Sequence, residues 1–185
     1  MKRCNWPNLE RNGTYLDYHD NEWGVASYGD DYLFEMFVLE SFHCGLSWLI
    51  ILNKREAFRE AFDNFDPYLI RKYNQDKINE LLENKGIVRN TSKIKATITN
   101  SESYIKIKEE FGSFSNYIWS FTDNKIIYNT DDSFVTTNEL SDKVSKDLKK
   151  RGFKFMGSVT THSYLEAIGV MNNHSLDCFR NKFHQ

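Results

Sequence analysis

Short amphipathic segments run along most of the 185-residue chain, and they restrict its fold more than any other feature of the sequence. In residues 30–42, Leu33, Phe34, Phe37 and Val38 recur at spacings of three and four, which places them on one face of a helix. The sequence therefore predicts an all-α fold, with a loop at 122–138 that contains a strand-like piece at 126–128. The predicted helices cover about 30–42 (capped by Asp30 or Asp31), 48–62 (capped by Ser47), a short helix from Pro67 (capped by Asp66), 76–84, a longer helix capped by Thr91 or Ser92, one from Ser113 to about 121, one from Ser141 to Gly152, and 160–168.

The chain is expected to form one domain over residues 1–185, because its length suits a single core and it contains no repeat and only two prolines. No apolar run approaches the roughly 18–20 residues that span a bilayer. The opening residues also lack the apolar stretch of a signal peptide. We therefore expect a cytoplasmic monomer with no membrane partner. Because the formal net charge is −2, any binding to nucleic acid would need a local basic face.

Four potential metal ligands lie near opposite ends of the chain. Cys4 and His19 are close to the N-terminus, and His174 and Cys178 are close to the C-terminus. Two thiolates and two imidazoles complete the tetrahedral shell of a zinc ion and leave no open position for water, so such an ion would be structural. The spacing alone, however, favours the simpler alternative of two buried thiols and two surface histidines.

A turn centred on Gly86 separates two predicted helices and predicts a helix-hairpin-helix at about residues 76–105. Gly86 can adopt the positive φ that a tight turn requires, and Ile87 can fill the space between the helices. The free N–H groups at the start of the second helix form an anion site suited to a DNA phosphate. Arg89 lies just before this helix and Lys93 lies in its first turns. An ordinary turn between two helices is the alternative.

Several contiguous motifs are spread over about residues 3–178. They include Tyr18-His19-Asp20-Asn21-Glu22-Trp23-Gly24, Leu39-Glu40, Gly45-Leu46-Ser47-Trp48, Phe65-Asp66-Pro67, Gly86-Ile87, Trp119-Ser120-Phe121 and Lys149-Lys150-Arg151-Gly152-Phe153. Together they resemble the 3-methyladenine DNA glycosylase I family along nearly the whole chain. The resemblance implies a helix-hairpin-helix DNA glycosylase fold. It also implies an enzyme that releases 3-methyladenine from alkylated double-stranded DNA by hydrolysing the N-glycosidic bond.

The resemblance also implies individual site residues. One structural Zn²⁺ would join the N-terminal segment (residues 1–20) to the C-terminal segment (170–180), with the ligands Cys4, His19, His174 and Cys178. Leu46, beside Gly45, would enter the duplex. The chain departs from the family at Ser41-Phe42-His43-Cys44, where the family has small or amide residues, so bulkier groups are expected at the pocket rim. The implied base pocket contains Trp6, Tyr15, Tyr18, Glu40 and Trp48.

These residue types suit the capture of a cationic base. Adenine methylated at ring position 3 is positively charged and leaves as a neutral molecule, so its release needs little acid catalysis. Electron-rich rings gain about 0.5–2 kcal/mol each from stacking on a cation. Glu40 can accept a hydrogen bond from the exocyclic amine and Tyr18 can bond the ring edge, which makes them the expected catalytic pair. Glu40 follows apolar Leu39 near the buried face, where an unpaired carboxylate is unfavourable, so a functional role is favoured.

Other interpretations of these residues remain open. The tryptophans fit core packing equally well, and the sequence alone favours a core position for Leu46. Because no lysine stands out as a Schiff-base nucleophile and no aspartate as a general base, we expect a monofunctional enzyme that leaves an abasic site. Two alternatives are a non-catalytic, zinc-stabilised DNA-binding module and a helical protein–protein adaptor. A third keeps the fold but changes the alkylated purine.

Overall fold

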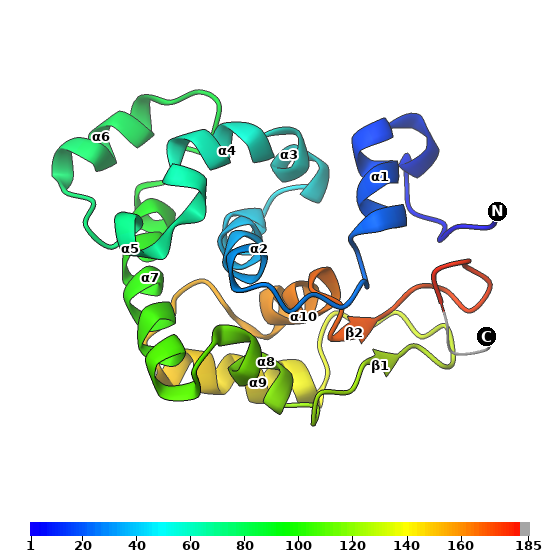
Figure 1. The fold of residues 1–185 in the computed structure, drawn as a ribbon. Coiled ribbons are helices and arrows are strands. Elements are labelled where there is room, and N and C mark those ends of the chain that lie inside the picture. The colour runs from blue at the N-terminus through cyan, green and yellow to red at the C-terminus, as the bar shows by residue number, and fades with distance from the viewer. Residues whose placement is uncertain (182–185) are drawn as a thin grey trace.

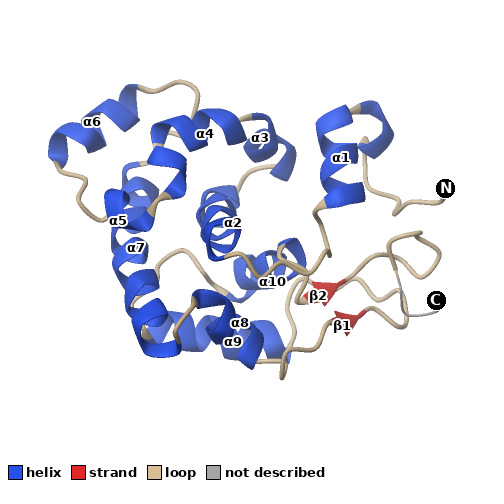
Figure 2. Ribbon diagram, in the orientation of Figure 1, coloured by secondary structure: helices blue, strands red, loops and turns tan. Residues whose placement is uncertain are grey.

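The computed structural model describes residues 1–181 and is mostly helical, as the sequence predicts (Figure 2). Residues 182–185, which the predicted domain includes, lie outside the described part. No helix of the described residues is long and apolar enough to cross a membrane. The helices are α1 (Gly13–Asn21), α2 (Asp30–His43), α3 (Trp48–Asn53), α4 (Arg55–Ala61), α5 (Pro67–Ile70), α6 (Gln75–Glu83), α7 (Thr91–Phe111), α8 (Phe114–Ser120), α9 (Glu139–Lys150) and α10 (Ser158–Ala167), with 3-10 turns η1 (Leu9–Arg11) and η2 (Asp63–Phe65).

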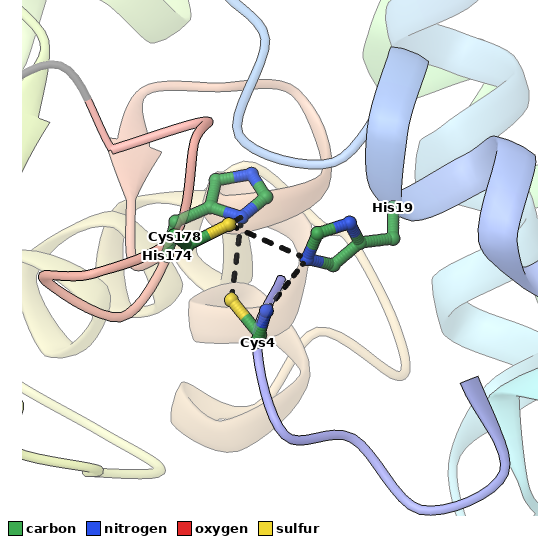
Figure 3. A group of neighbouring side chains, drawn as sticks. All are labelled: Cys4, His19, His174 and Cys178. Carbon is green, nitrogen blue, oxygen red and sulfur yellow. Dashed lines mark hydrogen bonds between the residues drawn. The ribbon is translucent and has the colours of Figure 1, made fainter. Parts of the chain in front are cut away.

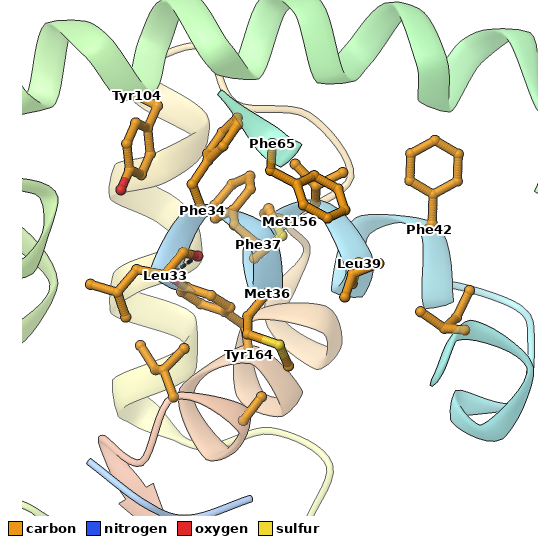
Figure 4. Packing of buried hydrophobic residues seen from close by; sticks show 14 of the residues in the cluster. Leu33, Phe34, Met36, Phe37, Leu39, Phe42, Phe65, Tyr104, Met156 and Tyr164 are labelled. Atoms are coloured by element: carbon orange, nitrogen blue, oxygen red, sulfur yellow. Dashed lines mark hydrogen bonds between the residues drawn. The ribbon is translucent and has the colours of Figure 1, made fainter. Parts of the chain in front are cut away.

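Helix α2 lies at the centre of the molecule and packs against α3, α7, α8 and α10 (Figure 1). The predicted apolar face of α2 is buried, but so are Met36, Leu39 and Glu40, because neighbouring helices cover the helix on several sides. Figure 4 shows this core, in which Phe34 packs on a tyrosine of α7 and Phe37 on a tyrosine of α10. The central position of α2 therefore holds Glu40 inside the molecule.

The two ends of the described chain come together. The segment before α1 and the segment after α10 lie at the same end of the molecule (Figure 1). Strand β1 (Ile127–Tyr128) pairs in parallel with β2 (Met171–Asn172) and holds the loop before α9 against the C-terminal segment. The strand-like piece predicted at 126–128 is thus confirmed. Strand β2 was not predicted, because two residues are too few to show an alternating pattern.

Most helices begin where the sequence predicts, and asparagine accounts for two of the differences. Asp66 and Ser113 cap α5 and α8, as expected. The cap of α7 is Asn90 rather than either of the two residues that follow it. The cap of α9 is Asn138, and Ser141 completes a capping box from inside the helix. Asparagine and serine are about equally good caps, so a run that contains both does not fix the first residue.

Three further boundaries differ from the prediction. The single helix expected at 48–62 is divided into α3 and α4 at Lys54. Helix α2 is capped by Gly29, so Asp30 and Asp31 lie in its first turn, where negative charge favours the helix dipole. Helix α1, capped by Asn12, was not predicted.

Candidate active site

Four potential metal ligands from the two ends of the chain meet in one buried cluster (Figure 3). The ligand atoms of Cys4, His19, His174 and Cys178 lie within 4.8 Å of one another. Both thiol sulfurs lie 3.4 Å from Nδ1 of His174, and the sulfur of Cys178 lies 3.8 Å from Nε2 of His19. Such spacings fit the edges of a tetrahedron with metal–sulfur bonds of about 2.3 Å and metal–nitrogen bonds of about 2.0 Å. Both histidines are fully buried, so the alternative of two surface histidines is wrong.

Each imidazole of the cluster is oriented by a hydrogen bond on its other ring nitrogen. Nδ1 of His19 lies 2.8 Å from the Asp20 carboxylate, which Arg3 in turn holds at 2.7 Å. Nε2 of His174 lies 2.8 Å from the carbonyl oxygen of Trp23. Outer partners of this kind fix ring orientation and tautomer in metal sites. The donor set and its surroundings therefore fit a tetrahedral cation.

Burial also sets the protonation of the cluster. It lowers the pKa of His174 to about 4, which leaves a neutral imidazole of the kind that binds metals. It raises the pKa of the Cys4 thiol to about 11, so a nearby cation is needed to hold the thiolate. The backbone N–H of Ser175 donates to the Cys4 sulfur at 3.3 Å, which favours that thiolate.

A cavity of about 560 Å³ lies beside the cluster, and all five residues of the predicted base pocket line it. The Trp6 ring lies 5.1 Å from the ring of Tyr15, and the Tyr18 ring lies 5.5 Å from that of Trp48, measured between centroids. Trp6 also packs edge-on against His19 at 4.9 Å, so the metal cluster supports one wall of the cavity. The volume lies within the range of small-molecule sites.

Glu40 brings a buried carboxylate to this cavity and is only 3% exposed. Burial raises its pKa above the usual value, and the contact with His43 opposes that change. Nδ1 of His43 lies 3.1 Å from Oε2, whereas no described residue donates a hydrogen bond to Oε1. The buried indole N–H of Trp48 likewise has no partner among the described residues. A buried donor without a partner disfavours folding, so the Trp48 N–H beside the free oxygen of Glu40 points to a role in binding a ligand.

Tyr18 is almost fully buried beside Glu40. Burial, followed by the charge of Glu40, raises the pKa of its hydroxyl well above the usual value. The hydroxyl therefore stays protonated and can act as a neutral hydrogen-bond donor.

Of the four unusual rim residues, only His43 reaches the cavity. Ser41 is buried and donates to the carbonyl oxygen of Val38, and Phe42 is buried against Phe58 of α4. Cys44 is exposed. The expectation of a bulkier rim therefore reduces to one imidazole, which contacts both Glu40 and Trp48.

Several cavity residues were not predicted from the sequence. Trp23, Ser163, Glu166 and Asn173 line the cavity together with the loop 129–135. Trp23 belongs to a quoted motif, which was a usable signal. The other three carry no local signal, because only the packing of α10 and the residues after β2 turns them toward the cavity.

Leu46, the residue expected to enter the duplex, and the adjacent Gly45 lie on a short loop between α2 and α3. Gly45 has φ of +84°, a conformation that favours glycine, and Leu46 is 38% exposed. The alternative of a core position for Leu46 is therefore wrong. The loop sits between two cavity residues, His43 and Trp48.

Helices α6 and α7 lie on either side of Gly86, as the sequence predicts, but the expected reason for Gly86 is wrong. Gly86 is not among the glycines with positive φ. It is needed for close packing instead, because an added Cβ would lie 2.9 Å from both the Ala57 side chain and Asn84 Oδ1. Ile87 is buried as expected, and Arg89 is exposed just before α7.

Lys93 requires a correction, because the structure turns it away from solvent. Its side chain is 7% exposed, and the ammonium donates at 2.8 Å to the carbonyl oxygens of Phe42 and Cys44. The periodicity of α7 explains this position, since Lys93 shares the buried face with Ile94 and Thr97. Lys93 therefore holds the end of α2 and the loop that carries Leu46, rather than presenting its charge to a phosphate.

Comparison with known proteins identifies relatives over the full length of the chain. A family model described as methyladenine glycosylase matches residues 6–181. The DNA-3-methyladenine glycosylase of Haemophilus influenzae is 38% identical over 179 residues, which cover 95% of this chain and 96% of that protein. The DNA-3-methyladenine glycosylase 1 of Escherichia coli is 37% identical over 181 residues and 96% of each chain.

Solved structures agree with these relatives. A crystal structure of 3-methyladenine DNA glycosylase I superimposes with a TM-score of 0.91 at 39% identity, covering 96% of this chain and 98% of the other. A variant of 3-methyladenine DNA glycosylase I in complex with 3-methyladenine gives a TM-score of 0.90 at 37% identity, covering 95% and 96%. The enzyme from Staphylococcus aureus gives 0.89 at 38% identity, covering 95% of each chain.

Proposed function

The chain belongs to the methyladenine glycosylase family, and from this premise we propose that it excises 3-methyladenine from alkylated double-stranded DNA. The observation that carries the proposal is the buried carboxylate of Glu40 in a cavity walled by Trp6, Tyr15, Tyr18 and Trp48. An anionic group among electron-rich rings is a receptor for a flat cation. The 3-methylated adenine of a damaged nucleotide is such a cation.

The proposed reaction is hydrolysis of the N-glycosidic bond in an extruded nucleotide. A stacked base is out of reach, so the enzyme must flip it from the duplex, and a damaged base is easier to flip. Leu46, exposed on the loop after α2, would fill the gap that the base leaves. The bond between the sugar and the cationic base is already weak. The protein therefore needs to capture the base and tolerate positive charge rather than supply an acid.

Within the cavity, Glu40 and Tyr18 would read the edge of the base. The free oxygen of Glu40 would accept from the exocyclic amine, and the protonated hydroxyl of Tyr18 would donate to the ring. Trp6, Tyr15 and Trp48 would stack on the faces of the base. His43 would hold Glu40 in place and favour its charged form.

We further propose a monofunctional enzyme that leaves an abasic site. A Schiff base would need a lysine in the cavity, and none of the described lining residues is a lysine. The ammonium of Lys93 is fixed on two backbone carbonyls and is not available as a nucleophile. A trapped enzyme–DNA adduct after borohydride reduction would refute this part of the proposal.

Binding to DNA would rest on backbone contacts at the hairpin. The first turn of α7 offers free N–H groups, and the exposed Arg89 lies beside it. Gly86 lets the turn pack against α4, so it acts through structure. Such contacts give affinity without sequence specificity, as a lesion-searching enzyme requires. We also propose that residues 1–185 form one domain and that the protein is monomeric and cytoplasmic.

The metal of the buried cluster is proposed to be one structural Zn²⁺. Cys4, His19, His174 and Cys178 would hold it, and as a Lewis acid it would keep the two thiols ionised. The ligands come from both ends of the chain, so together they would fix the N-terminal segment that carries Trp6 against the C-terminal segment. Four protein ligands fill the shell, and the reaction itself would not involve this site.

The proposal is tested by incubating the protein with methylated double-stranded DNA and identifying the released purines by mass spectrometry. We expect 3-methyladenine as the main product. Release of a different alkylated purine would show that the enzyme has another base specificity. The Glu40→Gln variant separates an enzyme from a DNA-binding module, because it should lose excision and keep DNA affinity. If the unsubstituted protein binds DNA but releases no purine, the proposed activity is wrong.

A further inference from the structure

The cavity has two chemically different walls. One wall is formed by the aromatic rings around Glu40, whereas the other is polar. The polar wall contains Ser163 and Glu166, one turn apart on α10, together with Asn173 and Ser175 after β2. An extruded nucleotide has a flat aromatic base and a polar sugar with its attacking water. The aromatic wall suits the base, so the polar wall is left for the sugar.

Glu166 is held firmly in this polar wall. Its Oε1 accepts a hydrogen bond of 2.6 Å from the Asn173 side chain. Its backbone carbonyl accepts from the N–H groups of Gly24 and Gly169. The side chain is 14% exposed, which leaves it partly open to the cavity. The carboxylate is therefore fixed in position before any ligand binds.

The second oxygen of Glu166 is free, whereas the first oxygen has the imidazole of His162 within ion-pair distance. No described residue donates a hydrogen bond to Oε2. Nδ1 of His162 lies 3.7 Å from Oε1, which is too long for a hydrogen bond. No lysine or arginine occurs among the described residues that line the cavity. The charge of Glu166 also contributes to the raised pKa of Glu40, so the two carboxylates are close enough to interact across the cavity.

We propose that Glu166 is a second functional carboxylate, which faces the deoxyribose and stabilises the positive charge that forms there during base release. This inference rests on the glycosylase function proposed above. Asn173 is the positioning residue that holds Oε1, and Oε2 is turned to the sugar. The two carboxylates thus have different roles, since Glu40 binds the base and Glu166 stabilises the transition state.

The movement of charge during the reaction explains why the two carboxylates have different roles. As the C1′–N9 bond breaks, its electron pair goes to N9 and the methylated base becomes neutral. The positive charge passes to C1′ and the ring oxygen of the sugar. A water oxygen then bonds to C1′ and its proton goes to solvent. Because the sugar is neutral before this step, a carboxylate beside it favours the transition state more than the bound substrate.

Other acidic groups of the cavity fit this role less well. Glu40 lies among the aromatic rings, where the base itself would cover it. Asp132 also lines the cavity, but one of its oxygens accepts from the backbone of Leu176 and the residue is exposed, so water screens its charge. Glu166 alone combines a fixed position, a free oxygen and partial burial.

The test compares chemistry with base binding in Glu166→Gln, which keeps the size of the side chain and removes the charge. We expect the single-turnover excision rate on methylated DNA to fall about tenfold, or about 1.4 kcal/mol. The Kd for free 3-methyladenine, measured by tryptophan fluorescence, should stay within about twofold. Glu109→Gln, which removes an exposed charge on α7, is the matched control and should change neither value.

The inference is overturned if Glu166→Gln keeps the full rate, or if rate and base affinity fall together. Asn173→Ala supplies a second arm that does not depend on the first variant folding. It should lower the rate several-fold without changing the base affinity, and it should add nothing in the Glu166→Gln background. An unchanged rate in Asn173→Ala also contradicts the inference. Failure of the unsubstituted protein to release 3-methyladenine would refute the proposed function instead.

Discussion

The buried metal cluster and the cavity beside it differ in whether their polar groups have partners within the protein. In the cluster, four ligand atoms point at one another, and both imidazoles have a second partner. In the cavity, an oxygen of Glu40, an oxygen of Glu166 and the indole N–H of Trp48 have no partner among the described residues. The two regions share a wall through Trp6, yet the polar groups are paired within the protein in the cluster and left open to a ligand in the cavity.

This difference separates residues that stabilise the fold from residues that await a ligand. A satisfied buried group stabilises the folded chain, and its removal leaves its partners buried without a hydrogen bond. An unsatisfied one opposes folding and is retained for another reason. Substitutions in the cluster should therefore lower stability first, and substitutions in the cavity should lower activity first.

The largest expected effect is on stability, from removal of one cluster ligand. Cys178→Ser should weaken metal binding and lower the free energy of unfolding by at least about 3 kcal/mol, because binding a structural metal contributes directly to folding. For a chain of this size, the melting temperature should fall by roughly 6–12 °C. Scanning calorimetry and metal analysis measure both quantities. The exposed Cys44→Ser is the control and should be neutral.

The next effect is on catalysis, from the cavity carboxylate. Glu40→Gln should lower kcat/KM for excision by about 10²- to 10³-fold, as for other groups that stabilise charge in the transition state. Its melting temperature should equal or exceed that of the unsubstituted protein, because a buried charge is removed. A variant that lost stability as well as activity would make Glu40 a structural residue and erase the contrast between the two regions.

Lys93 extends the contrast to the end of α2 and the loop that follows it. Lys93→Met should lower stability by about 1.5–3 kcal/mol, since two charge-assisted hydrogen bonds to backbone carbonyls are lost. The salt dependence of DNA binding should not change. Arg89→Ala should do the reverse, with unchanged stability and a reduction of about 1 in the salt slope. A smaller salt slope in Lys93→Met would show that Lys93 contacts a phosphate after all.

The smallest expected effect is the pH dependence of the difference between Glu40 and its neutral variant. Burial raises the pKa of Glu40 in the folded chain, so folding favours the protonated acid. Glu40 therefore contributes stability below the usual glutamate pKa, and this contribution is lost as the pH rises through the raised value.

The excess stability of Glu40→Gln should accordingly grow in urea titrations as the pH rises from the usual glutamate pKa through the raised pKa of Glu40. Excision by the unsubstituted protein should fall on acidification, beginning above the pKa of an ordinary glutamate. A stability difference that stayed constant with pH would show that Glu40 does not titrate as a buried acid.

Sequence reasoning succeeded where short-range patterns decide the structure. The spacing of Leu33, Phe34, Phe37 and Val38 located α2, and the motifs around Glu40 and Trp48 indicated residues that the structure brings to one cavity. In both cases the information lies within a few consecutive positions. The four cluster ligands depended on the family resemblance, because their spacing alone favoured separate positions.

It failed where the partner of a residue is distant in the chain. The position of Lys93 in a first helical turn suggests a surface charge, but its ammonium is buried because it donates to backbone carbonyls about fifty positions away in the chain. Gly86 was assigned a positive φ in the turn, whereas a side chain there is excluded by Ala57 on another helix together with Asn84. Glu166 lies on a helix whose sequence does not show that it faces a cavity. Such contacts depend on tertiary packing.

The proposed function requires that the carboxylate of Glu40, surrounded by indole and phenol rings, binds the damaged base. A crystal structure of this protein soaked with free 3-methyladenine tests it most directly. We predict the purine stacked between Trp48 and the pair Trp6 and Tyr15, with its exocyclic amine on Glu40. A purine found elsewhere, or a cavity that stays empty at saturating ligand, would show that Glu40 does not bind the base.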